Sequence, residues 1–244
     1  MSVHDYLQEK IKKGEKLLFA VIDPIDYPSI EKAVETAGKA EEAGFDALLV
    51  GGSTEVQGYI LDETVKRIKQ NFSLPVILFP GNIGTLTPHA DALYFMSLLN
   101  SRNAYWITKA QLLALPVIKR MGLEILSTAY VVVEPGGTVG WVGDADLIPR
   151  NKPKILAGFA MLAQEIGYKY FLMDVGSNAP EHVPLEAISL VKKAAPDITV
   201  IVAGGVKTPE QLREIYKAGA DIVQIGTVLE QGKDPRPFVE AKWI

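Results

Sequence analysis

The chain has 244 residues, a net charge of −4, and 48% hydrophobic against 22% charged residues, which is typical of a globular protein with a sizeable core. No block of lysine and arginine stands out, so the concentrated cationic face needed for sequence-independent nucleic-acid binding is missing. The chain contains no cysteine, which excludes disulfides, thiol nucleophiles and cysteine–zinc sites.

The N-terminal stretch 1–18 is charged and amphipathic, and it lacks the apolar core of a signal peptide. No apolar run approaches the ~20 residues that a membrane span requires. We therefore expect a cytoplasmic protein with at most peripheral membrane contact.

Short, almost continuously apolar segments recur along the chain, and each ends in glycine, proline or a polar turn. Parallel strands that are buried on both faces have this character. The candidate strands are 17–23, 46–52, 75–81, 91–99, 124–133, 168–174, 198–205 and 221–226.

Helical patterns separate most of these strands. Residues 28–44 start with proline and end with glycine, and residues 209–220 follow Thr208, a favourable N-cap. Segments 152–167 and 184–196 have the same pattern. Alternating strands and helices without a break in composition predict one α/β domain over residues 1–244, a single (β/α)8 TIM barrel. A doubly wound open sheet is the alternative.

Two connections are irregular. The stretch 81–90, GNIGTLTPHA, is too short and too rich in glycine and proline for a crossover helix. We therefore predict that the third helix is shortened or replaced by an irregular segment, which leaves an apolar slot in the helical ring. The stretch 134–150 is instead a long glycine-rich excursion after the fifth strand, and such loops commonly carry function.

The last three strands end in small and polar residues, namely Gly176-Ser177-Asn178, Gly204-Gly205 and Gly226-Thr227. Active sites of these barrels lie at the C-terminal ends of the strands, and glycine lets backbone N–H groups approach an anion there. One glycine after a strand is sufficiently explained by a tight turn. Three neighbouring turns of this kind predict a phosphate site.

Asp23 ends the first strand and Ser53 the second. A carboxylate and a hydroxyl on adjacent strands, next to a phosphate substrate, are suited to a Mg²⁺ ion that keeps several waters. The alternative is that Asp23 only caps the turn that follows it. His4, His89 and His182 lack the spacing of metal ligands.

Three tryptophans, Trp106, Trp141 and Trp243, are large apolar groups outside the predicted strands. Trp141 lies in the glycine-rich excursion, where it is either an anchor that packs the loop or a subunit contact, because an exposed tryptophan is costly without a partner. Taken from the residues alone, the chain is a phosphate-handling barrel with a candidate Mg²⁺ site and an apolar side slot.

Five segments together resemble the geranylgeranylglyceryl phosphate synthase family, the prenyltransferases that form the first ether bond of archaeal membrane lipids. They are PVILFPGN (75–82), FMSLLNSRN (95–103), TAYVVVEPGGTVGWVGDADLIPR (128–150), AGGVKTPEQL (203–212) and AGADIVQIGTVLE (218–230). The resemblance runs from about Leu18 to Leu229. The excursion resembles the second group of the family, whose members form dimers or larger assemblies.

The resemblance implies a Mg²⁺-dependent transfer of the geranylgeranyl group from its diphosphate to the C3 hydroxyl of sn-glycerol 1-phosphate, with release of diphosphate. It implies Asp23 and Ser53 as metal ligands, Asp174 as proton acceptor, the slot as the site of the prenyl tail, and a homo-oligomer. The glycerol phosphate site that it implies comprises Leu172, Met173, Asp174, Val175, Gly176, Ser177, Asn178, Gly204, Gly205, Gly226 and Thr227.

The chain departs from the family pattern at three positions. Leu172 replaces a tyrosine that orients the glycerol, Asp174 replaces a glutamate, and Ile25 replaces an acidic residue. Two alternatives therefore stay open. One is a related prenyltransferase with another chain length or acceptor. The other is a phosphate-binding barrel without this activity, or an isomerase or aldolase of phosphosugars, although the apolar slot argues against a phosphosugar enzyme.

Overall fold

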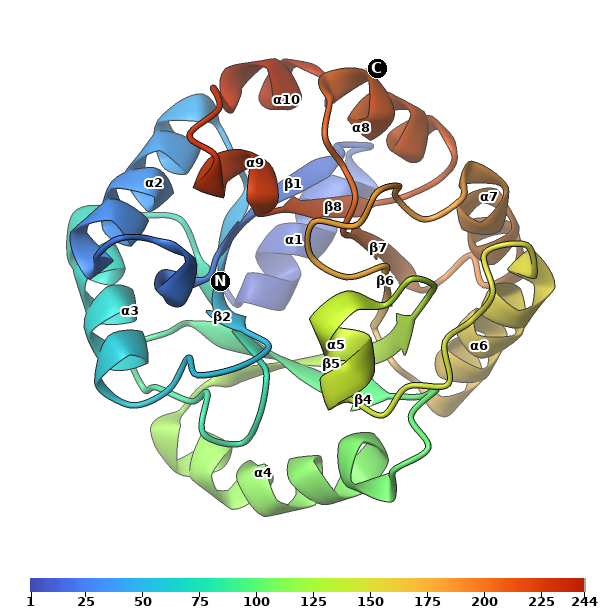
Figure 1. Ribbon diagram of the computed structural model, residues 1–244, viewed down its shortest axis with the longest axis horizontal. Helices are drawn as coiled ribbons and strands as arrows, with labels where there is room; N and C mark the ends of the chain where they lie inside the picture. The colour runs from blue at the N-terminus through green and yellow to red at the C-terminus, as the bar shows by residue number, and fades with distance from the viewer. Residues whose placement is uncertain (244) are drawn as a thin grey trace.

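The computed structural model describes residues 1–243 and contains a closed barrel of parallel strands in sequence order (Figure 1). The strands are β1 (Leu17–Ile22), β2 (Ala47–Gly52), β3 (Val76–Pro80), β4 (Ala92–Leu98), β5 (Glu124–Val132), β6 (Tyr170–Asp174), β7 (Thr199–Ala203) and β8 (Ile222–Ile225). Because β8 pairs with β1, the predicted TIM barrel is confirmed and the open sheet is wrong.

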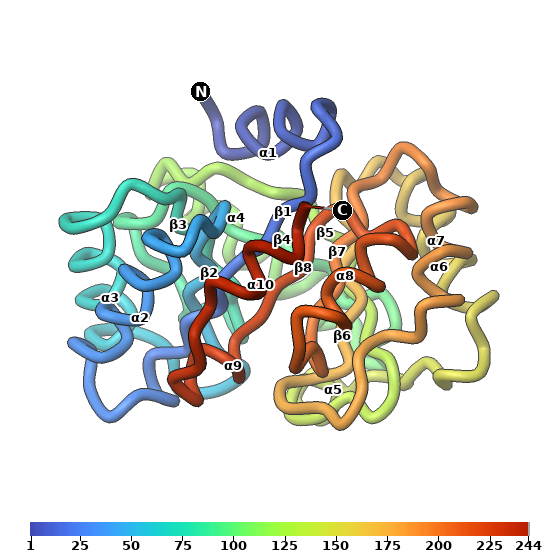
Figure 2. The backbone as a smooth tube through the Cα atoms, turned by 90° about the horizontal axis from the view of Figure 1, so that it is seen from above, coloured from blue at the N-terminus to red at the C-terminus, as the bar shows by residue number. Residues whose placement is uncertain are grey.

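Most of the helices surround the barrel, and the others lie across its two ends (Figure 1 and Figure 2). The helices are α1 (Val3–Lys12), α2 (Ile30–Ala43), α3 (Tyr59–Asn71), α4 (Ala110–Met121), α5 (Gly137–Val142), α6 (Pro153–Ile166), α7 (Leu185–Ala194), α8 (Pro209–Lys217), α9 (Thr227–Glu230) and α10 (Arg236–Glu240). A 3-10 turn, η1 (Pro24–Asp26), follows β1, and a π-helical turn, η2 (Tyr105–Lys109), precedes α4. The predicted cap of α8 is present, since the Thr208 hydroxyl accepts from the Gln211 N–H.

Residues 81–91, all of which the structure describes, contain no helix, as predicted from their length and composition. The chain passes from β3 to β4 in turns, and the ring of helices is interrupted there between α3 and α4 (Figure 1). The glycine-rich excursion after β5 folds differently, because it forms the short helix α5 on the C-terminal side of the barrel.

The N-terminal end of the barrel is covered by α1, which lies at the opposite end from α5 and α9 (Figure 2). The first N–H groups of this helix, from Val3 and His4, donate to the Glu124 carboxylate at 2.6 and 2.8 Å. The His4 ring is also hydrogen-bonded to the Tyr170 hydroxyl inside the barrel, at 2.8 Å. The C-terminal end is therefore the end at which a cavity can open.

Three pairs of strands are fastened at their N-terminal ends in the same way. An aspartate just before one strand accepts a backbone N–H from the preceding strand and also pairs with a lysine. The groups are Asp46 with Leu18 N–H and Lys242, Asp91 with Val76 N–H and Lys69, and Asp221 with Val200 N–H and Lys192. Because each carboxylate is tied to two elements, these contacts hold the strand register on which the opposite end depends.

Side chains alternate between the inside of the barrel and the layer beneath the helices, as the period of a strand requires. On β6, Tyr170 and Leu172 belong to the inner apolar cluster, whereas Phe171 and Met173 pack in the outer one. Asp174 shares the inward face with Leu172 and stands at the mouth. No helix among residues 1–243 is long and apolar enough to cross a bilayer.

Candidate active site

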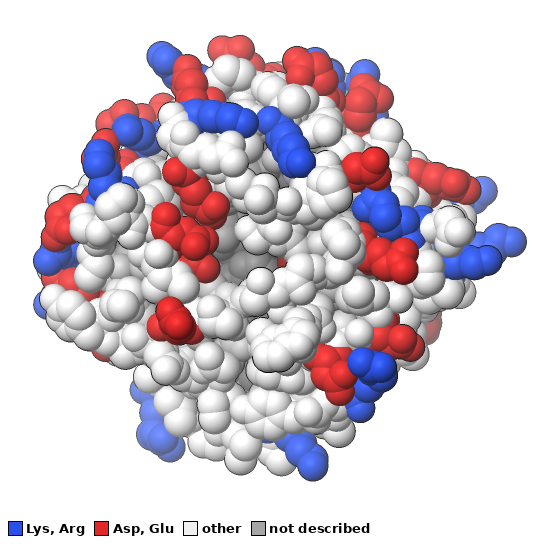
Figure 3. All heavy atoms as spheres, in the orientation of Figure 1, with Lys and Arg blue, Asp and Glu red and all other residues white. Residues whose placement is uncertain are grey.

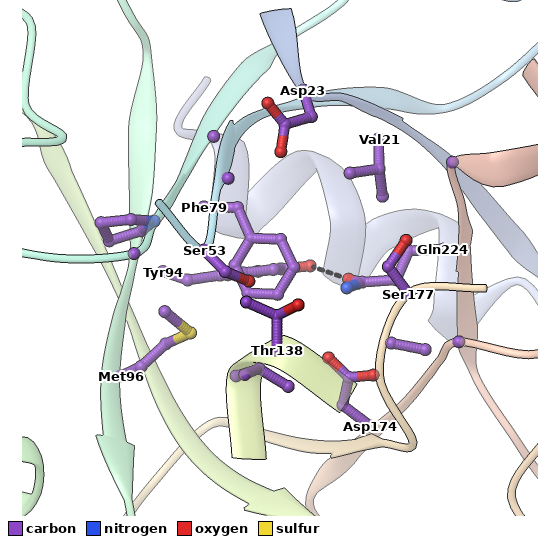
Figure 4. A pocket seen from close by; sticks show the side chains of 18 of the residues that line it. Val21, Asp23, Ser53, Phe79, Tyr94, Met96, Thr138, Asp174, Ser177 and Gln224 are labelled. Atoms are coloured by element: carbon purple, nitrogen blue, oxygen red, sulfur yellow. Dashed lines mark hydrogen bonds between the residues drawn. The ribbon is translucent and has the colours of Figure 1, made fainter. Parts of the chain in front are cut away.

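A cavity of about 550 Å³ opens at the C-terminal end of the barrel. It is visible as the hollow near the centre of Figure 3, and its lining is drawn in Figure 4. The lining comes from the ends of the strands on every side, from α5, and from α4. The cavity therefore combines the barrel mouth with the gap left by the missing helix.

Asp174 lies at the inner end of this cavity and is 7% exposed. Its Oδ2 accepts a hydrogen bond from the Tyr130 hydroxyl at 2.7 Å, and its Oδ1 accepts from the Gly176 N–H at 2.7 Å. Burial raises the pKa of this carboxyl, while the two hydrogen bonds lower it, and the net direction is upward. The carboxylate is thus held in one orientation and is more basic than an ordinary aspartate.

The turns after β6 and β7 make the wall above Asp174. Gly204 and Gly205 have φ values of +80° and +68°, and a Cβ atom on either would come within 2.5 and 2.3 Å of backbone oxygens of Gly176 and Glu181. No other residue fits there without moving the turns. Within residues 1–243 the N–H groups of Ser177 and Gly205 have no hydrogen-bond acceptor, and both residues line the cavity.

The third turn completes that wall. Gly226 and Thr227 line the cavity, and the Thr227 hydroxyl is 3.5 Å from the Ser177 hydroxyl. Lys207 and Lys233 stand at the rim. The three turns predicted from the sequence are therefore brought together, and with two cations at the rim they are suited to a phosphate group.

Asp23 lies on the other side of the cavity, above the end of β1 (Figure 4). Burial, together with the charges of Asp26 and Glu230, raises the pKa of Asp23 to about 7. The pKa of Glu230 is also raised to about 7, by burial and by Asp26. Figure 3 shows acidic side chains gathered on one side of the hollow. Asp26, which is exposed, lines the same side of the cavity.

The donor set around Asp23 fits a divalent cation. The carboxylates of Asp23, Asp26 and Glu230 form no ion pair with any described lysine or arginine, so their charge is uncompensated. Asp23 Oδ2 lies against the backbone of Gly52, beside Ser53. The described chain holds no cluster of three His, Cys, Asp or Glu side chains, so an ion here would take one or two protein ligands and complete its shell with phosphate oxygens and water, as Mg²⁺ does. Asp23 also accepts the Ile25 N–H at 3.3 Å, so the capping alternative is realised as well.

The apolar branch of the cavity runs outward past β4 towards α4. Its walls are formed by Leu86, Leu93, Phe95, Met96, Trp106, Ala110, Ala114 and Ile118. Phe79 and Tyr94 stand where this branch meets the barrel mouth, their rings in edge-to-face contact with centroids 5.6 Å apart (Figure 4). The slot predicted from the short third connection is therefore present, and it is continuous with the polar end.

Several residues expected in the glycerol phosphate site lie elsewhere. The side chains of Leu172, Met173 and Val175 are fully buried and do not line the cavity. Leu172 lies below Asp174 inside the barrel, and the other two pack beneath the helices. Only Asp174, Gly176, Ser177 and Asn178 of this segment are at the cavity or hold its wall.

None of the histidines lines the cavity, whereas one of the tryptophans does. Neither His4, His89 nor His182 lines the cavity, in agreement with their lack of metal-ligand spacing. Trp106 lines the apolar branch, whereas Trp141 on α5 is 85% exposed. This exposure disfavours the interpretation of Trp141 as a packing anchor within the chain.

Four residues of the site were not identified from the sequence. Tyr130 and Tyr94 look like ordinary core residues of apolar strands, and only the closed barrel brings their hydroxyl groups to Asp174 and Gln224. Gln224 is a lone polar residue in the apolar strand IVQI, which is a signal in itself. Thr138 projects from α5 over the cavity (Figure 4).

The relation to known proteins agrees with this geometry. The model of the PcrB family matches residues 9–241. The chain is 50% identical over 229 residues to the geranylgeranylglyceryl phosphate synthase of Thermococcus kodakarensis, covering 94% of this chain and 90% of the relative. It is 46% identical over 239 residues to the enzyme of the same name from Methanobrevibacter smithii, covering 97% and 95% of the two chains.

A solved structure extends the likeness to three dimensions. The (S)-3-O-geranylgeranylglyceryl phosphate synthase of Thermoplasma acidophilum, in complex with its substrate sn-glycerol-1-phosphate, superposes with a TM-score of 0.94. It is 37% identical and covers 99% of this chain and 98% of its own. A match along almost the whole chain, in sequence and in fold, shows that this protein belongs to the PcrB family.

Proposed function

We propose that the protein is a Mg²⁺-dependent geranylgeranylglyceryl phosphate synthase, which joins geranylgeranyl diphosphate to the C3 hydroxyl of sn-glycerol 1-phosphate and releases diphosphate. The observation that carries this proposal is the composition of this cavity, which has a carboxylate and glycine turns on one side and an apolar slot on the other. The shared name of the Thermococcus and Methanobrevibacter relatives and the ligand of the Thermoplasma structure point the same way.

The acceptor fits the side formed by β6, β7 and β8. Its phosphate would take the unpaired N–H groups of Ser177 and Gly205, with Lys207 and Lys233 compensating its charge at the rim. Its glycerol would then point down towards Asp174, since the turns stand above this carboxylate.

The C3 hydroxyl must lose a proton as it bonds to C1 of the donor. Asp174 is the carboxylate of the acceptor side, and its raised pKa suits a general base. Tyr130 and Gly176 each occupy one lone pair of its oxygens, so the remaining lone pairs are free for the substrate hydroxyl. The attacking oxygen is thereby aimed across the cavity rather than free to rotate.

The donor fits the opposite side, with its diphosphate near Asp23 and Ser53 and its tail in the slot. Bound Mg²⁺ would supply charge neutralisation of the leaving diphosphate. Asp23 and Ser53 are the residues proposed to hold it, because the carboxylates of this side have no cationic partner among residues 1–243. Burial of the tail against Leu93, Phe95 and Trp106 supplies most of the donor affinity, at about 0.8 kcal/mol per buried CH₂.

The proposal also includes the chain length of the preferred prenyl donor. Trp106 is the largest side chain that lines the apolar branch, and we expect it to limit the space left for the tail. This favours C20 over much longer tails, and a prenyltransferase of different chain length is the rival reading.

Purified protein with Mg²⁺, sn-glycerol 1-phosphate and an equimolar mixture of C15, C20 and C35 diphosphates tests the proposal, with products identified by mass spectrometry. We expect the C20 ether to dominate, to disappear with EDTA, and to fall at least about 100-fold with Asp174→Ala. Dominance of another chain length would favour the rival prenyltransferase. Absence of any ether, with phosphate ligands still bound, would favour a barrel without this activity.

A homo-oligomer is part of the same proposal. Trp141, Leu112 and Leu113 are 85%, 71% and 59% exposed, which is unusual for large apolar side chains without a partner. Sedimentation of the protein and of Trp141→Glu would test it, since a monomeric wild-type protein would contradict the expectation.

A further inference from the structure

Gln224 is a buried amide inside the barrel that the proposed reaction does not yet use. It is 2% exposed and lines the cavity, and its neighbours on β8 are apolar. An amide buried in an apolar strand is costly unless its polar atoms find partners. The Tyr94 hydroxyl supplies one partner, 3.4 Å from Oε1. The Nε2 group of Gln224 forms no hydrogen bond with any of residues 1–243.

The register of the barrel places this amide opposite Asp174. Ala203 on β7 is the pairing partner of Asp174 on one side and of Gln224 on the other. All three residues point inward, and Ala203 has only a methyl group. Two strand spacings, about 10 Å, therefore separate the backbones of Asp174 and Gln224 across a small residue. Figure 4 shows the carboxylate and the amide both at the cavity.

Asp174 and Gln224 both line the cavity and both have hydrogen-bonding capacity left for a ligand. The Tyr130 hydroxyl is bonded to Asp174, and the Tyr94 hydroxyl is bonded to Gln224. A glycerol phosphate held by the turns above presents two hydroxyl groups to this floor. The reacting C3 hydroxyl belongs with the base, Asp174, so the C2 hydroxyl is left for the amide.

We infer that the Gln224 side chain hydrogen-bonds the C2 hydroxyl of the acceptor and thereby selects between the two enantiomers of glycerol phosphate. The inference rests on the proposed function and adds a specificity-determining residue to it. An enantiomer with its C2 hydroxyl on the other side of the carbon chain would leave the amide unpaired, and an unpaired buried amide is strongly disfavoured. Tyr94 acts as a positioning residue, because it holds the amide and is not expected to touch the acceptor.

The experiment compares three acceptors on three variants. The acceptors are sn-glycerol 1-phosphate, sn-glycerol 3-phosphate, and 3-hydroxypropyl phosphate, which keeps the phosphate and the reacting hydroxyl but lacks the C2 hydroxyl. The variants are Gln224→Met, which keeps length and volume, Tyr94→Phe, and the matched control Gln8→Met. Gln8 lies on α1 at the other end of the barrel, where it bonds to Thr199.

We expect Gln224→Met to raise the KM for sn-glycerol 1-phosphate by about 10- to 100-fold, the worth of one buried hydrogen bond, with a smaller change in kcat. Its kcat/KM for 3-hydroxypropyl phosphate should stay within about twofold of the wild type, and its preference for one enantiomer should collapse. Tyr94→Phe should move the same ratios less far. Gln8→Met should leave them unchanged.

Equal losses for all three acceptors with Gln224→Met would overturn the inference, since they would indicate only a structural role. Direct calorimetric titration with sn-glycerol 1-phosphate and 3-hydroxypropyl phosphate separates this failure from that of the proposed function. If the wild type transfers no prenyl group but binds sn-glycerol 1-phosphate through Gln224, the proposed reaction fails and the assignment of the amide holds. If the wild type binds neither acceptor, both fail.

Discussion

Replacement of Tyr130 by phenylalanine removes one atom from the site and leaves its shape intact. The Tyr130 hydroxyl donates to Asp174 Oδ2 at 2.7 Å, and the ring, which is 4% exposed, remains packed near Phe79. A hydrogen bond to a charged group is worth about 1.5–3 kcal/mol. If this bond orients the base in the transition state, kcat/KM should fall by about 10- to 150-fold, since each 1.36 kcal/mol is a factor of ten.

The dependence of kcat/KM on pH provides a second test of the Tyr130→Phe substitution. Burial raises the pKa of Asp174, and the hydrogen bond from Tyr130 opposes that rise. Tyr130→Phe therefore raises the pKa further, and the acid limb of kcat/KM should move to higher pH, because only the ionised carboxylate accepts the proton. The pH dependence of the free energy of unfolding follows from the same shift in pKa. A carboxyl whose pKa is raised by folding stabilises the protein below its unfolded pKa, and this contribution is lost as pH rises through the folded pKa. As the pH increases through this range, Tyr130→Phe should therefore lose more stability than the wild type.

Steady-state kinetics between pH 5 and 9 and thermal unfolding at both ends of that range would measure these effects. Tyr216→Phe is the matched control, because its buried hydroxyl bonds to the Leu17 carbonyl in the layer outside the barrel. It should cost about 1 kcal/mol of stability at every pH and leave the acid limb in place. Wild-type kcat/KM and an unmoved acid limb in Tyr130→Phe would refute the assignment of Asp174 as an oriented base.

Three further predictions concern the donor side of the cavity and the N-terminal end of the barrel. Asp23→Asn should stabilise the Mg²⁺-free protein by about 1–2 kcal/mol at pH 8, after discounting for solvent screening. The reason is that the pKa of Asp23 rises from 3.8 to about 7 on folding, so the ionised carboxylate destabilises the folded protein increasingly between these two pH values. The variant should also lose the Mg²⁺-induced rise in Tm, and a Tm below that of the wild type at pH 8 would contradict the argument. Trp106→Ala should shift competition products towards donors one isoprene unit longer than C20, by about tenfold or more, because each extra buried CH₂ adds about 0.8 kcal/mol; an unchanged product ratio in mass spectrometry would exclude Trp106 from the end of the tail site. Lys242→Met should lower the free energy of unfolding by about 1–3 kcal/mol in urea titration, since it leaves the buried Asp46 with one lysine fewer, and an unaffected midpoint would show that Lys10 suffices.

Much of the architecture is readable along the chain because its causes are local. Runs such as LLFAVI and TVIVA are apolar on both faces, which specifies strands buried under helices. The missing third crossover helix follows from ten residues that contain too much glycine and proline to form one. The glycine turns after β6 and β7 are visible for the same reason, since the positive φ values of Gly176, Gly204 and Gly205 are set within one or two residues.

The environment of Asp174 could not be read in this way. Tyr130 precedes it by 44 residues, and their hydrogen bond exists only because β5 and β6 pair with Tyr130 beside Leu172. The hydroxyl that Leu172 lacks is thus present on the neighbouring strand. The same holds for Asp26 and Glu230, which reach the acidic side of the cavity from opposite ends of the chain.

The sequence by itself determined which segments become strands, where a helix is missing and which turns approach an anion, because these depend on composition and backbone freedom over a few residues. Only the closed barrel decided which side chains meet at the mouth. Tyr94 and Gln224 are 130 residues apart, and their contact depends on tilt, register and closure of the whole sheet. These properties belong to all strands together, and no single segment encodes them.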